Sequence, residues 1–441
     1  MEVTLDQVLR CREERAERQR DLIQRFSKPV ISFCMNIAGP VKTDNLIERG
    51  FRIGLRSLEG SLLAAGAGIL SKQVLYSVTG PEAFFCVDMP ALKLKEITCR
   101  IEDRDSLGRL FDLDVIKTDF SKVERAELGK PERKCLICGN EAKVCSSRRI
   151  HSVKELQERT RSILENSVPE SEAELIAFLA VKALLCEVYI TPKPGLVDRA
   201  NNGSHPDMDM LSFAGSAAVL HSYFKKACLT GDSFKNLRNA GLEAEEKMFL
   251  ETRGVNTHKG AVFTMGIVCA ATGLAIAEGN FDTSVILDQC AKLASGIVNR
   301  DLGSLDSGSC KTAGQRLFAK YGITGIRGEM EKGLPSVRDY GLPVLEKLIS
   351  EGHSWDEAGS NALLAILANI TDTNMVSRGG LEKAQKASAQ AKELVGQGFV
   401  SLDKMRELDL QYQKENLSPG GAADLLAVCC FLHFAKEAFS V

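Results

Sequence analysis

The chain has 441 residues, of which 44% are hydrophobic and 26% charged, and its formal net charge is −2. This composition is typical of a soluble globular protein and excludes a disordered, collagen-like or strongly basic chain. The length predicts more than one domain, each with its own core. The first 166 residues are mildly basic and the remainder mildly acidic, an asymmetry too small to indicate nucleic acid as a partner.

The cysteines and the apolar stretches indicate the cellular compartment in which the protein resides. Fourteen cysteines are scattered along the chain, several within apolar helical stretches, which is typical of reduced thiols in the cytosol. The N-terminus is charged throughout and lacks the apolar core of a signal peptide. Residues 261–277 carry no charge, but they are few and rich in Ala, Gly and Thr, so we expect a buried helix instead of a membrane span. These features predict a cytoplasmic protein with neither a membrane nor a nucleic acid as partner.

The first part of the chain, to about residue 150, is predicted to be a mixed α/β domain. Helices are expected over 5–26 and 44–65, and short apolar runs between turn residues predict strands within 29–39, 73–80, 82–89 and 110–116. A polar helix followed by Pro169, with Ser171 as the next N-cap, predicts a junction near 167–171. The predicted domains are therefore 1–166 and 167–441.

The second domain is predicted to be all-α, with glycine-rich loops between its helices. Long apolar periods at helical spacing recur at 172–189, 209–229, 235–251, 260–277, 283–299, 356–370, 381–396 and 420–438. The sequence therefore predicts two domains, a mixed α/β domain and a larger helical one.

Two stretches of the first domain predict phosphate and metal binding. SFCMNIAGPVK, residues 32–42, places Asn36 and Lys42 beside bare amides that can hold a phosphate; the alternative is a tight turn with a surface lysine. Asp112 and Asp114 alternate with apolar residues, so on a strand both carboxylates share one face. Such a pair is unfavourable unless a cation lies between the two charges, which predicts Mg²⁺; the alternative is an exposed strand face.

A cysteine-rich segment, RKCLICGNEAKVCSSRRIH, follows these stretches. Cys135 and Cys138 are spaced C-x-x-C, and Cys145 and His151 come after them, a set that can form a Cys₃His zinc site. The alternative is a group of structural thiols, with the adjacent arginines binding phosphate.

The loops of the second domain are dense in Gly, Asn, Asp, His and Arg, and functional groups of helical domains gather in loops. These loops are 191–209, 254–260, 322–329, 372–380 and 416–426. In the last of them, Ser418 is expected to cap a helix whose amides Gly420 and Gly421 leave bare. A helix start of this kind is an anion site.

The loop GVNTHKG, residues 254–260, has the same construction. Asn256 or Thr257 is expected to cap the following helix, and Lys259 adds a positive charge. Together with Arg327 and Arg378 beside glycines, the two helix starts predict a polyphosphate ligand; the alternative is that the glycine loops are only turns. Four aspartates are available for Mg²⁺: Asp198, Asp207, Asp372 and Asp424.

Residues 171–441 resemble the triphosphoribosyl-dephospho-coenzyme A synthase family. The resemblance is carried, in this order, by the motifs TPKPGLVDR, GSHPDMD, GVNTHKGAVF, GIRGE, DTN with RGG, and NLSPGGAADLLA. The resemblance implies that ATP loses adenine and keeps its triphosphate while its ribose is joined to the 2′-hydroxyl of 3′-dephospho-coenzyme A. It implies His258 or His205 as the acid and Asp198 or Asp207 as base or metal ligand. The other motif residues would position the retained triphosphate or its Mg²⁺: Lys193, Asn256, Thr257, Lys259, Arg327, Glu329, Asp372, Asn374, Arg378, Ser418, Gly420, Gly421 and Asp424.

The first domain resembles the citrate lyase holo-acyl-carrier-protein synthase family over nearly all of 1–165. The resemblance is carried by Arg18 and Gln19, SFCMNIAGPVK, the TGPE at 79–82, GRLFDLDV, and RKCLICG with CSSRRIH. Such enzymes attach the phosphoribosyl-dephospho-coenzyme A unit to a serine of the lyase's acyl carrier subunit and release pyrophosphate. The implied roles are a metal on Asp112 and Asp114, and charge neutralisation by Lys42, Arg109 and Arg133.

The two resemblances imply one bifunctional transferase, because the second domain would make the precursor that the first domain consumes. Its expected partners are ATP, 3′-dephospho-coenzyme A and the citrate lyase acyl carrier subunit, with Mg²⁺ as the cofactor and Zn²⁺ in the first domain if the cysteine site forms. The alternative is a zinc-stabilised carrier- or RNA-docking module fused to an ATP-using helical enzyme.

Overall fold

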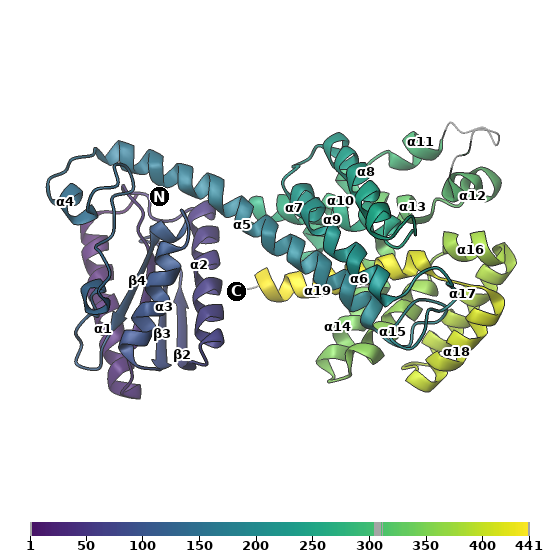
Figure 1. Ribbon diagram of the computed structural model, residues 1–441, viewed down its shortest axis with the longest axis horizontal. Helices are drawn as coiled ribbons and strands as arrows, with labels where there is room; N and C mark the ends of the chain where they lie inside the picture. The colour runs from purple at the N-terminus through teal and green to yellow at the C-terminus, as the bar shows by residue number, and fades with distance from the viewer. Residues whose placement is uncertain (1, 304–309, 311, 440–441) are drawn as a thin grey trace. The chain divides into compact units, whose positions relative to one another are not determined.

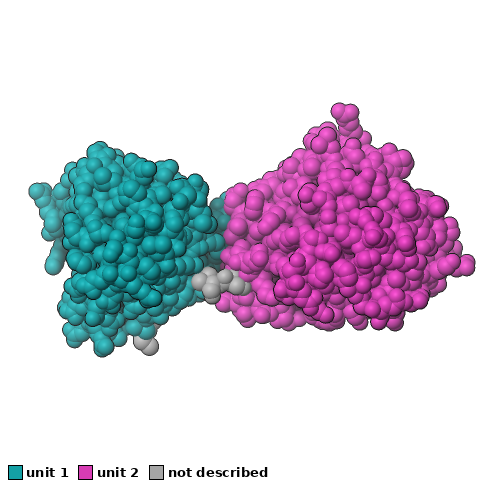
Figure 2. Space-filling view, turned by 90° about the horizontal axis from the view of Figure 1, so that it is seen from below, with its two compact units in different colours: residues 1–172 teal, residues 173–441 magenta. Residues whose placement is uncertain are grey.

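The structure is a computed structural model that describes residues 2–303, 310 and 312–439. The chain forms two compact units, residues 1–172 and 173–441, which are coloured separately in Figure 2. A mixed sheet-and-helix first unit and a helical second unit confirm the predicted fold class.

The first unit is built on a four-stranded antiparallel sheet in the order β2-β3-β1-β4 (Figure 1). The strands are β1 Val30–Met35, β2 Gly68–Leu75, β3 Glu82–Asp88 and β4 Phe111–Ile116. Helices α2 (Asn45–Ala64) and α3 (Ala91–Asp103) cover the face that carries Phe33, Phe85 and Leu113. Helix α1, Leu5–Phe26, packs on one end of the opposite face, against Val30, Phe84, Cys86 and Ile116. The rest of this second face is polar, because strand residues alternate between the two faces.

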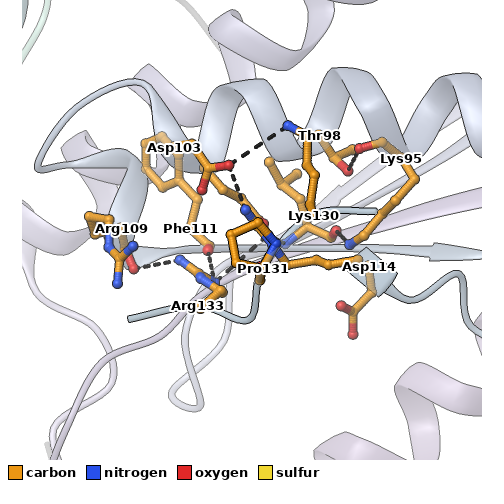
Figure 3. A network of polar contacts seen from close by, with 12 residues as sticks. Lys95, Thr98, Asp103, Arg109, Phe111, Asp114, Lys130, Pro131 and Arg133 are labelled. Atoms are coloured by element: carbon orange, nitrogen blue, oxygen red, sulfur yellow. Dashed lines mark hydrogen bonds and ion pairs between the residues drawn. The ribbon is translucent and has the colours of Figure 1, made fainter. Parts of the chain in front are cut away.

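Strand β4 lies at the edge of the sheet, and side chains from other segments satisfy its outer backbone groups. Glu102 Oε1 accepts from the Leu113 amide at 3.0 Å, and Lys95 Nζ donates to the Leu113 carbonyl at 3.1 Å. The Arg133 guanidinium donates to the carbonyls of Phe111, at 2.8 Å, and Arg109, at 2.7 Å. Figure 3 shows Arg133 beside this strand, with the Asp114 carboxylate pointing away from the network. An edge strand closed in this way is protected from pairing with another chain.

Three short helices lie in the segments before and after β4, and the last of them leads into α5. They are η1 Gly108–Leu110, η2 Arg125–Leu128 and α4 Ala142–Ser147, before α5 Val153–Tyr189. The predicted helix break at Pro169, with a new N-cap at Ser171, is wrong, since α5 runs through both residues. A proline inside a helix costs about 3 kcal/mol. Packing on either side offsets this cost, because Val168 is fully buried and Glu172 forms a two-pronged ion pair with Arg49, at 2.6 and 3.1 Å.

The second unit is helical, and its described residues contain no strand. After α5 come α6 Met210–Val219, α7 His221–Cys228, α8 Phe234–Glu251, α9 Lys259–Ala277, α10 Thr283–Leu293, α11 Ile297–Leu302, α12 Ala313–Tyr321, α13 Gly325–Glu331, η3 Val337–Gly341, α14 Leu342–Ser350, α15 Trp355–Leu367, α16 Thr373–Gly379, α17 Leu381–Gly396, α18 Leu402–Glu415 and α19 Gly420–Phe439. Two predicted helices are divided: 209–229 at Leu220, and 283–299 at Gly296, whose backbone is left-handed (φ 73°).

Helix α9 is the central helix of this unit. Residues of α7, α8, α10 and α19 join it in one hydrophobic core. Among the described residues it is the one helix long and apolar enough to cross a membrane, and most of its residues are buried in this core. Gly266 allows the close contact with α7, because a Cβ there would lie 1.9 Å from the Tyr223 hydroxyl. This contact packs the first half of α9 closely against α7.

Candidate active sites

The second unit has a buried polar centre where α5 ends and α9 and α19 begin. Lys193 is 1% exposed, and its ammonium is paired with Glu187 on α5. Burial raises the pKa of Glu187, and the Lys193 charge opposes that rise. Such a buried ion pair adds little to the stability of the fold, because the cost of removing both charges from water offsets the attraction between them. Lys193 was predicted from its motif, whereas Glu187 lies in an ordinary helical pattern and was missed.

His258 is the second buried group of this centre, and it is 3% exposed. Its Nδ1 lies 2.7 Å from the Ser216 hydroxyl, which itself accepts from the Thr257 hydroxyl at 2.8 Å. Since Thr257 donates to Ser216, the Ser216 proton is directed at Nδ1, which leaves the ring proton on Nε2. Nε2 is buried and has no partner among the described residues. Burial, together with the Lys193 charge, lowers the pKa of His258 to about 3, so the ring is neutral at physiological pH.

The start of α9 differs from its prediction. The helix begins at Lys259 with His258 as N-cap and no side-chain cap, so the prediction that Asn256 or Thr257 caps it is wrong. Thr257 instead bonds to Ser216, and Asn256 is exposed. The first-turn amides of α9 therefore have no side-chain cap.

Asp424, the fifth residue of α19, lies against this helix start. Gly260 is required there, because a Cβ would lie 1.9 Å from Asp424 Oδ2. The Asp424 carboxylate makes no hydrogen bond or ion pair within the described chain. Burial, with the charges of Glu187 and Asp372, raises its pKa well above the ordinary value. A carboxylate without a partner among like charges is suited to receive positive charge from a ligand.

Asp372 differs from Asp424 because its carboxylate is fully engaged. It caps α16 through the amides of Asn374 and Met375, at 2.8 and 3.1 Å, and accepts from the Ala422 amide of α19 at 2.9 Å. The prediction that the amides at the start of α19 are bare is therefore wrong. Asn374 packs against Gly420, where a Cβ would lie 2.4 Å from its side-chain nitrogen. This arrangement joins α16 to α19 and leaves Asp372 little capacity for a metal.

His205, Ser418 and Arg378 form a cluster that joins three predicted loops. His205 Nε2 lies 2.7 Å from the Ser418 hydroxyl, and its Nδ1 lies 3.4 Å from Arg378. Arg378 also donates to Asn416 at 2.9 Å and to the Ser204 carbonyl. Burial and the Arg378 charge lower the pKa of His205.

The aspartates of the 191–209 loop have separate positions. Asp198 accepts from the amides of Lys193, Ala200 and Asn201, between 2.7 and 3.1 Å, and so holds the loop in shape. Asp207 is exposed. The structure thus gives Asp198 a bonding pattern typical of a loop-organising carboxylate, and its predicted catalytic role stays a prediction.

Two cavities flank the buried centre. The first, of about 310 Å³, brings together Lys259, Gly260 and Arg327 with mostly apolar walls from α7, α8 and α9. Lys259 is paired with Glu245 at 2.8 Å, and Arg327 with Asp301 at 3.0 Å. These acidic partners, and Arg238 beside them, were not predicted because they carry no motif.

The second cavity, of about 260 Å³, joins the 322–329 and 372–380 loops. Glu329, Asp372 and Gly421 line it, and Ile326 on α13 lines both cavities. Glu329 accepts from the Ser336 amide at 3.0 Å. The predicted ligand residues are therefore distributed among two cavities, the buried centre, the His205–Ser418–Arg378 cluster and, for Asn256 and Asp207, the exposed surface.

In the first unit, Asp112 and Asp114 lie on the same face of β4, as predicted from their spacing. Asp114 pairs with Lys122 at 2.5 Å, and Cys34 Sγ lies 3.9 Å from Asp112 Oδ2. Burial and the neighbouring Asp114 raise the pKa of Asp112. Burial likewise raises the pKa of the Cys34 thiol to about 12, so Cys34 is not a thiolate nucleophile. Two adjacent carboxylates on a rigid strand fit a divalent cation.

The predicted basic residues of this unit donate hydrogen bonds to backbone carbonyls. Arg133 and Arg109 donate to carbonyls, Arg109 to that of Lys134. Lys42 Nζ donates to the Ile37 carbonyl at 2.6 Å, and Asn36 is exposed. The predicted phosphate contacts of these residues stay predictions. Each arginine could bind a phosphate only with the donors that its backbone hydrogen bonds leave, or by giving up those bonds.

Helix α1 supplies arginines that the sequence did not single out for phosphate. Arg15 and Arg18, three residues apart, share a helix face and line a cavity of about 200 Å³ with Thr79 and Glu82 of the TGPE segment. Arg15 pairs with Glu82 at 2.6 Å and adds positive charge near Asp112. The helical spacing of Arg15 and Arg18, together with the TGPE segment, was the sequence signal that could have identified this cavity.

The four predicted zinc ligands converge. The ligand atoms of Cys135, Cys138, Cys145 and His151 all lie within 4.8 Å of one another. This is the arrangement that the cysteine spacing predicts.

Comparison with known families assigns both units. Residues 173–440 match the family described as ATP:dephospho-CoA triphosphoribosyl transferase, and residues 3–167 match the family described as Apo-citrate lyase phosphoribosyl-dephospho-CoA transferase. These ranges contain the two sets of sites described above.

Relatives with both parts in one chain are similar over the full length. Protein CitXG of Leuconostoc mesenteroides subsp. cremoris is 36% identical, with 98% of this chain and 97% of the relative covered. Protein CitXG of Haemophilus influenzae is 33% identical, with 97% and 96% covered. A probable 2-(5''-triphosphoribosyl)-3'-dephosphocoenzyme-A synthase of Photobacterium profundum is 40% identical over 60% of this chain and 88% of its own length. The chain therefore belongs to the CitXG family, in which a CitX transferase domain precedes a CitG triphosphoribosyl transferase domain.

Proposed function

We propose that the second unit joins the ribose of ATP to the 2′-hydroxyl of 3′-dephospho-coenzyme A. The hydroxyl oxygen bonds to C1′ of the ribose, the bond from C1′ to adenine breaks, and adenine takes up the proton that the hydroxyl loses. The observation that carries this proposal is His258, a neutral buried imidazole whose Nε2 proton has no partner in the described chain. A donor preorganised in this way stabilises a departing base more than the bound substrate.

Asp424 and Lys193 complete the proposed mechanism. Breaking a glycosidic bond places positive charge on the ribose, and Asp424 offers a carboxylate beside the start of α9 that no other described residue engages. Burial, with the charge of Lys193, keeps His258 neutral, and Lys193 is itself held by Glu187. Mg²⁺, bound with the triphosphate, would neutralise its charge. The triphosphate is not broken, so its contacts only position it.

The product from ATP and 3′-dephospho-coenzyme A tests this function. We expect stoichiometric free adenine, measured by chromatography, and no ADP. Formation of ADP would identify a kinase and contradict the proposal, because the bond broken would then be to phosphorus.

Lys259→Ala is expected to raise the KM for ATP about tenfold with a smaller change in kcat, because Lys259 lines the first cavity and positions the retained triphosphate. The measurement is the initial rate of adenine release against ATP concentration. Lys247→Ala, on the neighbouring helix α8 but outside the residues that line the cavity, is the control. A fall in kcat at unchanged KM would indicate that Lys259 acts in the chemical step and not in ATP binding.

Asp424→Asn is expected to stabilise the second unit while it slows adenine release. The raised pKa of Asp424 means that the folded state binds protons more tightly than the unfolded state, so folding loses stability as pH rises above about 3.8. Asparagine removes this loss, so the melting temperature should rise at pH 8 and remain unchanged near pH 3.5. Each kcal/mol of recovered unfolding free energy corresponds to a rise of roughly 2–4 °C. An unchanged melting temperature at pH 8 with full activity would contradict both roles.

We propose that the first unit transfers the phosphoribosyl-dephospho-coenzyme A unit to a serine of a citrate lyase acyl carrier subunit. The serine oxygen bonds to the phosphorus nearest the ribose, pyrophosphate leaves, and the serine proton is released. Asp112 and Asp114 would hold Mg²⁺, which supplies charge neutralisation for the leaving pyrophosphate. The relatives that share both parts favour this transferase over a docking module.

We further propose a cytoplasmic location. Cysteines such as Cys86, Cys99 and Cys269 are buried thiols that form no disulfide, as expected in a reducing compartment. The carrier protein and both nucleotides would then be available in the same compartment.

A further inference from the structure

We propose that Cys135, Cys138, Cys145 and His151 bind one structural Zn²⁺, and that this ion fixes the segment that ties Arg133 and Arg109 to strand β4. In a tetrahedral site with zinc–sulfur bonds of about 2.3 Å, ligand sulfurs lie about 3.8 Å apart. Cys138 and Cys145 sulfurs are 3.4 Å apart, and His151 Nε2 is 3.2 Å from the Cys138 sulfur. A small expansion of the cluster accommodates the ion.

The backbone around Cys135 forms the tight turn that a metal-binding C-x-x-C pair requires. The Cys135 amide donates to the Asn140 carbonyl at 2.6 Å, and the Gly139 amide donates to the Cys135 carbonyl at 3.3 Å. Gly139 has a left-handed backbone (φ 75°), and the Ile137 amide points at the Cys135 sulfur at 3.5 Å. An amide directed at a ligand sulfur orients it and stabilises its thiolate form.

This segment has little hydrophobic core of its own. Between residues 130 and 150, Cys145 is the one buried residue, and the others are exposed or half-buried. The order present comes from a few backbone bonds, such as that of the Ala142 amide to the Arg133 carbonyl at 2.8 Å. Small elements without a core depend on a metal or a disulfide for stability, and all these cysteines are free. The four converging ligands therefore point to a metal as the missing constraint.

The site is coupled to the β4 carboxylates through two arginines. Arg133, two residues before Cys135, donates to the carbonyls of Phe111 and Arg109 (Figure 3), and Arg109 donates back to the Lys134 carbonyl. Phe111 directly precedes Asp112. Metal loss would release both arginines and loosen the start of the strand that presents Asp112 and Asp114.

The test begins with the metal content of the full chain, purified after expression with added zinc. We expect one zinc per chain by mass spectrometry, its loss in Cys138→Ser, and its retention in Cys99→Ala, which removes a buried thiol of the same unit outside the cluster. Cobalt substituted for zinc should give the visible absorption of a tetrahedral thiolate site. A wild-type chain without zinc, or zinc retained in Cys138→Ser, would overturn the proposal.

A second measurement follows removal of the ion by a chelator, without mutation. Hydrogen exchange should increase at 133–151 and 109–114 and remain unchanged in the second unit. Pyrophosphate release, which rests on the proposed function of the first unit, should fall at least tenfold, while adenine release changes less than twofold. Bound zinc with unchanged exchange at 109–114 would refute the coupling, whereas altered exchange with no transferase activity in any form would refute the proposed function alone.

Discussion

His258→Asn is expected to lower the rate of adenine release by about 10²–10³-fold, the usual contribution of one preorganised hydrogen-bond donor. Asparagine keeps a polar group where Nδ1 meets Ser216 but has none at the position of Nε2, which is the atom without a partner. ATP binding, measured separately by equilibrium titration, should change little. The expected loss is therefore in kcat, since the donor acts as the base departs.

Two comparison variants make this expectation specific. His258→Gln carries an amide that reaches the position of Nε2, so it should recover part of the rate. His221→Ala removes a half-exposed histidine of the same unit and should leave the rate unchanged. Equal losses in the Asn and Gln variants, with lower melting temperatures in both, would indicate a purely structural role for His258.

The ionisation of His258 adds a stability test with a defined sign. Its pKa is about 3 in the folded protein against 6.5 for an exposed imidazole, so between these values the unfolded chain binds more protons. Acidification from pH 6.5 towards 3 therefore destabilises the second unit, by up to about 1.4 kcal/mol per pH unit from this group. His258→Asn should show a weaker loss of stability in denaturant titrations between pH 6.5 and 4.5.

Asp112→Asn and Asp114→Asn are each expected to reduce pyrophosphate release by on the order of 10²–10³-fold, because each removes one carboxylate from the proposed Mg²⁺ site. The assay combines the precursor with apo-carrier, and mass spectrometry of the carrier confirms the attached group. Adenine release by the second unit should be unaffected and serves as an internal control for folding.

Asp119→Asn is the matched control, because Asp119 is exposed in the turn after β4 and bonds only within that turn, to Ser121. Carrier binding is measured in parallel. Pyrophosphate release that persists in Asp112→Asn and Asp114→Asn would show that these carboxylates are not catalytic, whereas carrier docking without pyrophosphate release in the unmutated chain would identify a docking module.

Some parts of the fold and of the candidate sites were predictable from local sequence. The period-2 alternation around Asp112 and Asp114 determined that both carboxylates share one face of a strand. Apolar periodicity predicted the core helix at 260–277, and the cysteine spacing predicted the cluster that now converges. These are properties of neighbouring residues, so they do not depend on how the chain folds back on itself.

Local sequence failed where a distant segment competes for a hydrogen bond. The amides at the start of α19 are not bare because Asp372, fifty residues earlier, accepts from Ala422. Thr257 does not cap α9 because Ser216 lies within reach of its hydroxyl. Pro169 does not end α5 because buried packing and the ion pair of Glu172 with Arg49 stabilise the continuous helix.

The amino-acid sequence by itself determined the two-part organisation, the family and the residues that carry chemistry, since motifs and periodicity are properties of the chain. Only the tertiary structure decided which of those residues are free to act. It assigned Asp372 and Asp198 to backbone amides and left Asp424 without a hydrogen-bond or ion-pair partner among the described residues. It also buried His258 with an Nε2 that has no hydrogen-bond partner in the part of the chain that the structure describes. The physical reason is that burial and hydrogen-bond partners, which set a group's pKa and availability, come from segments far apart in the chain.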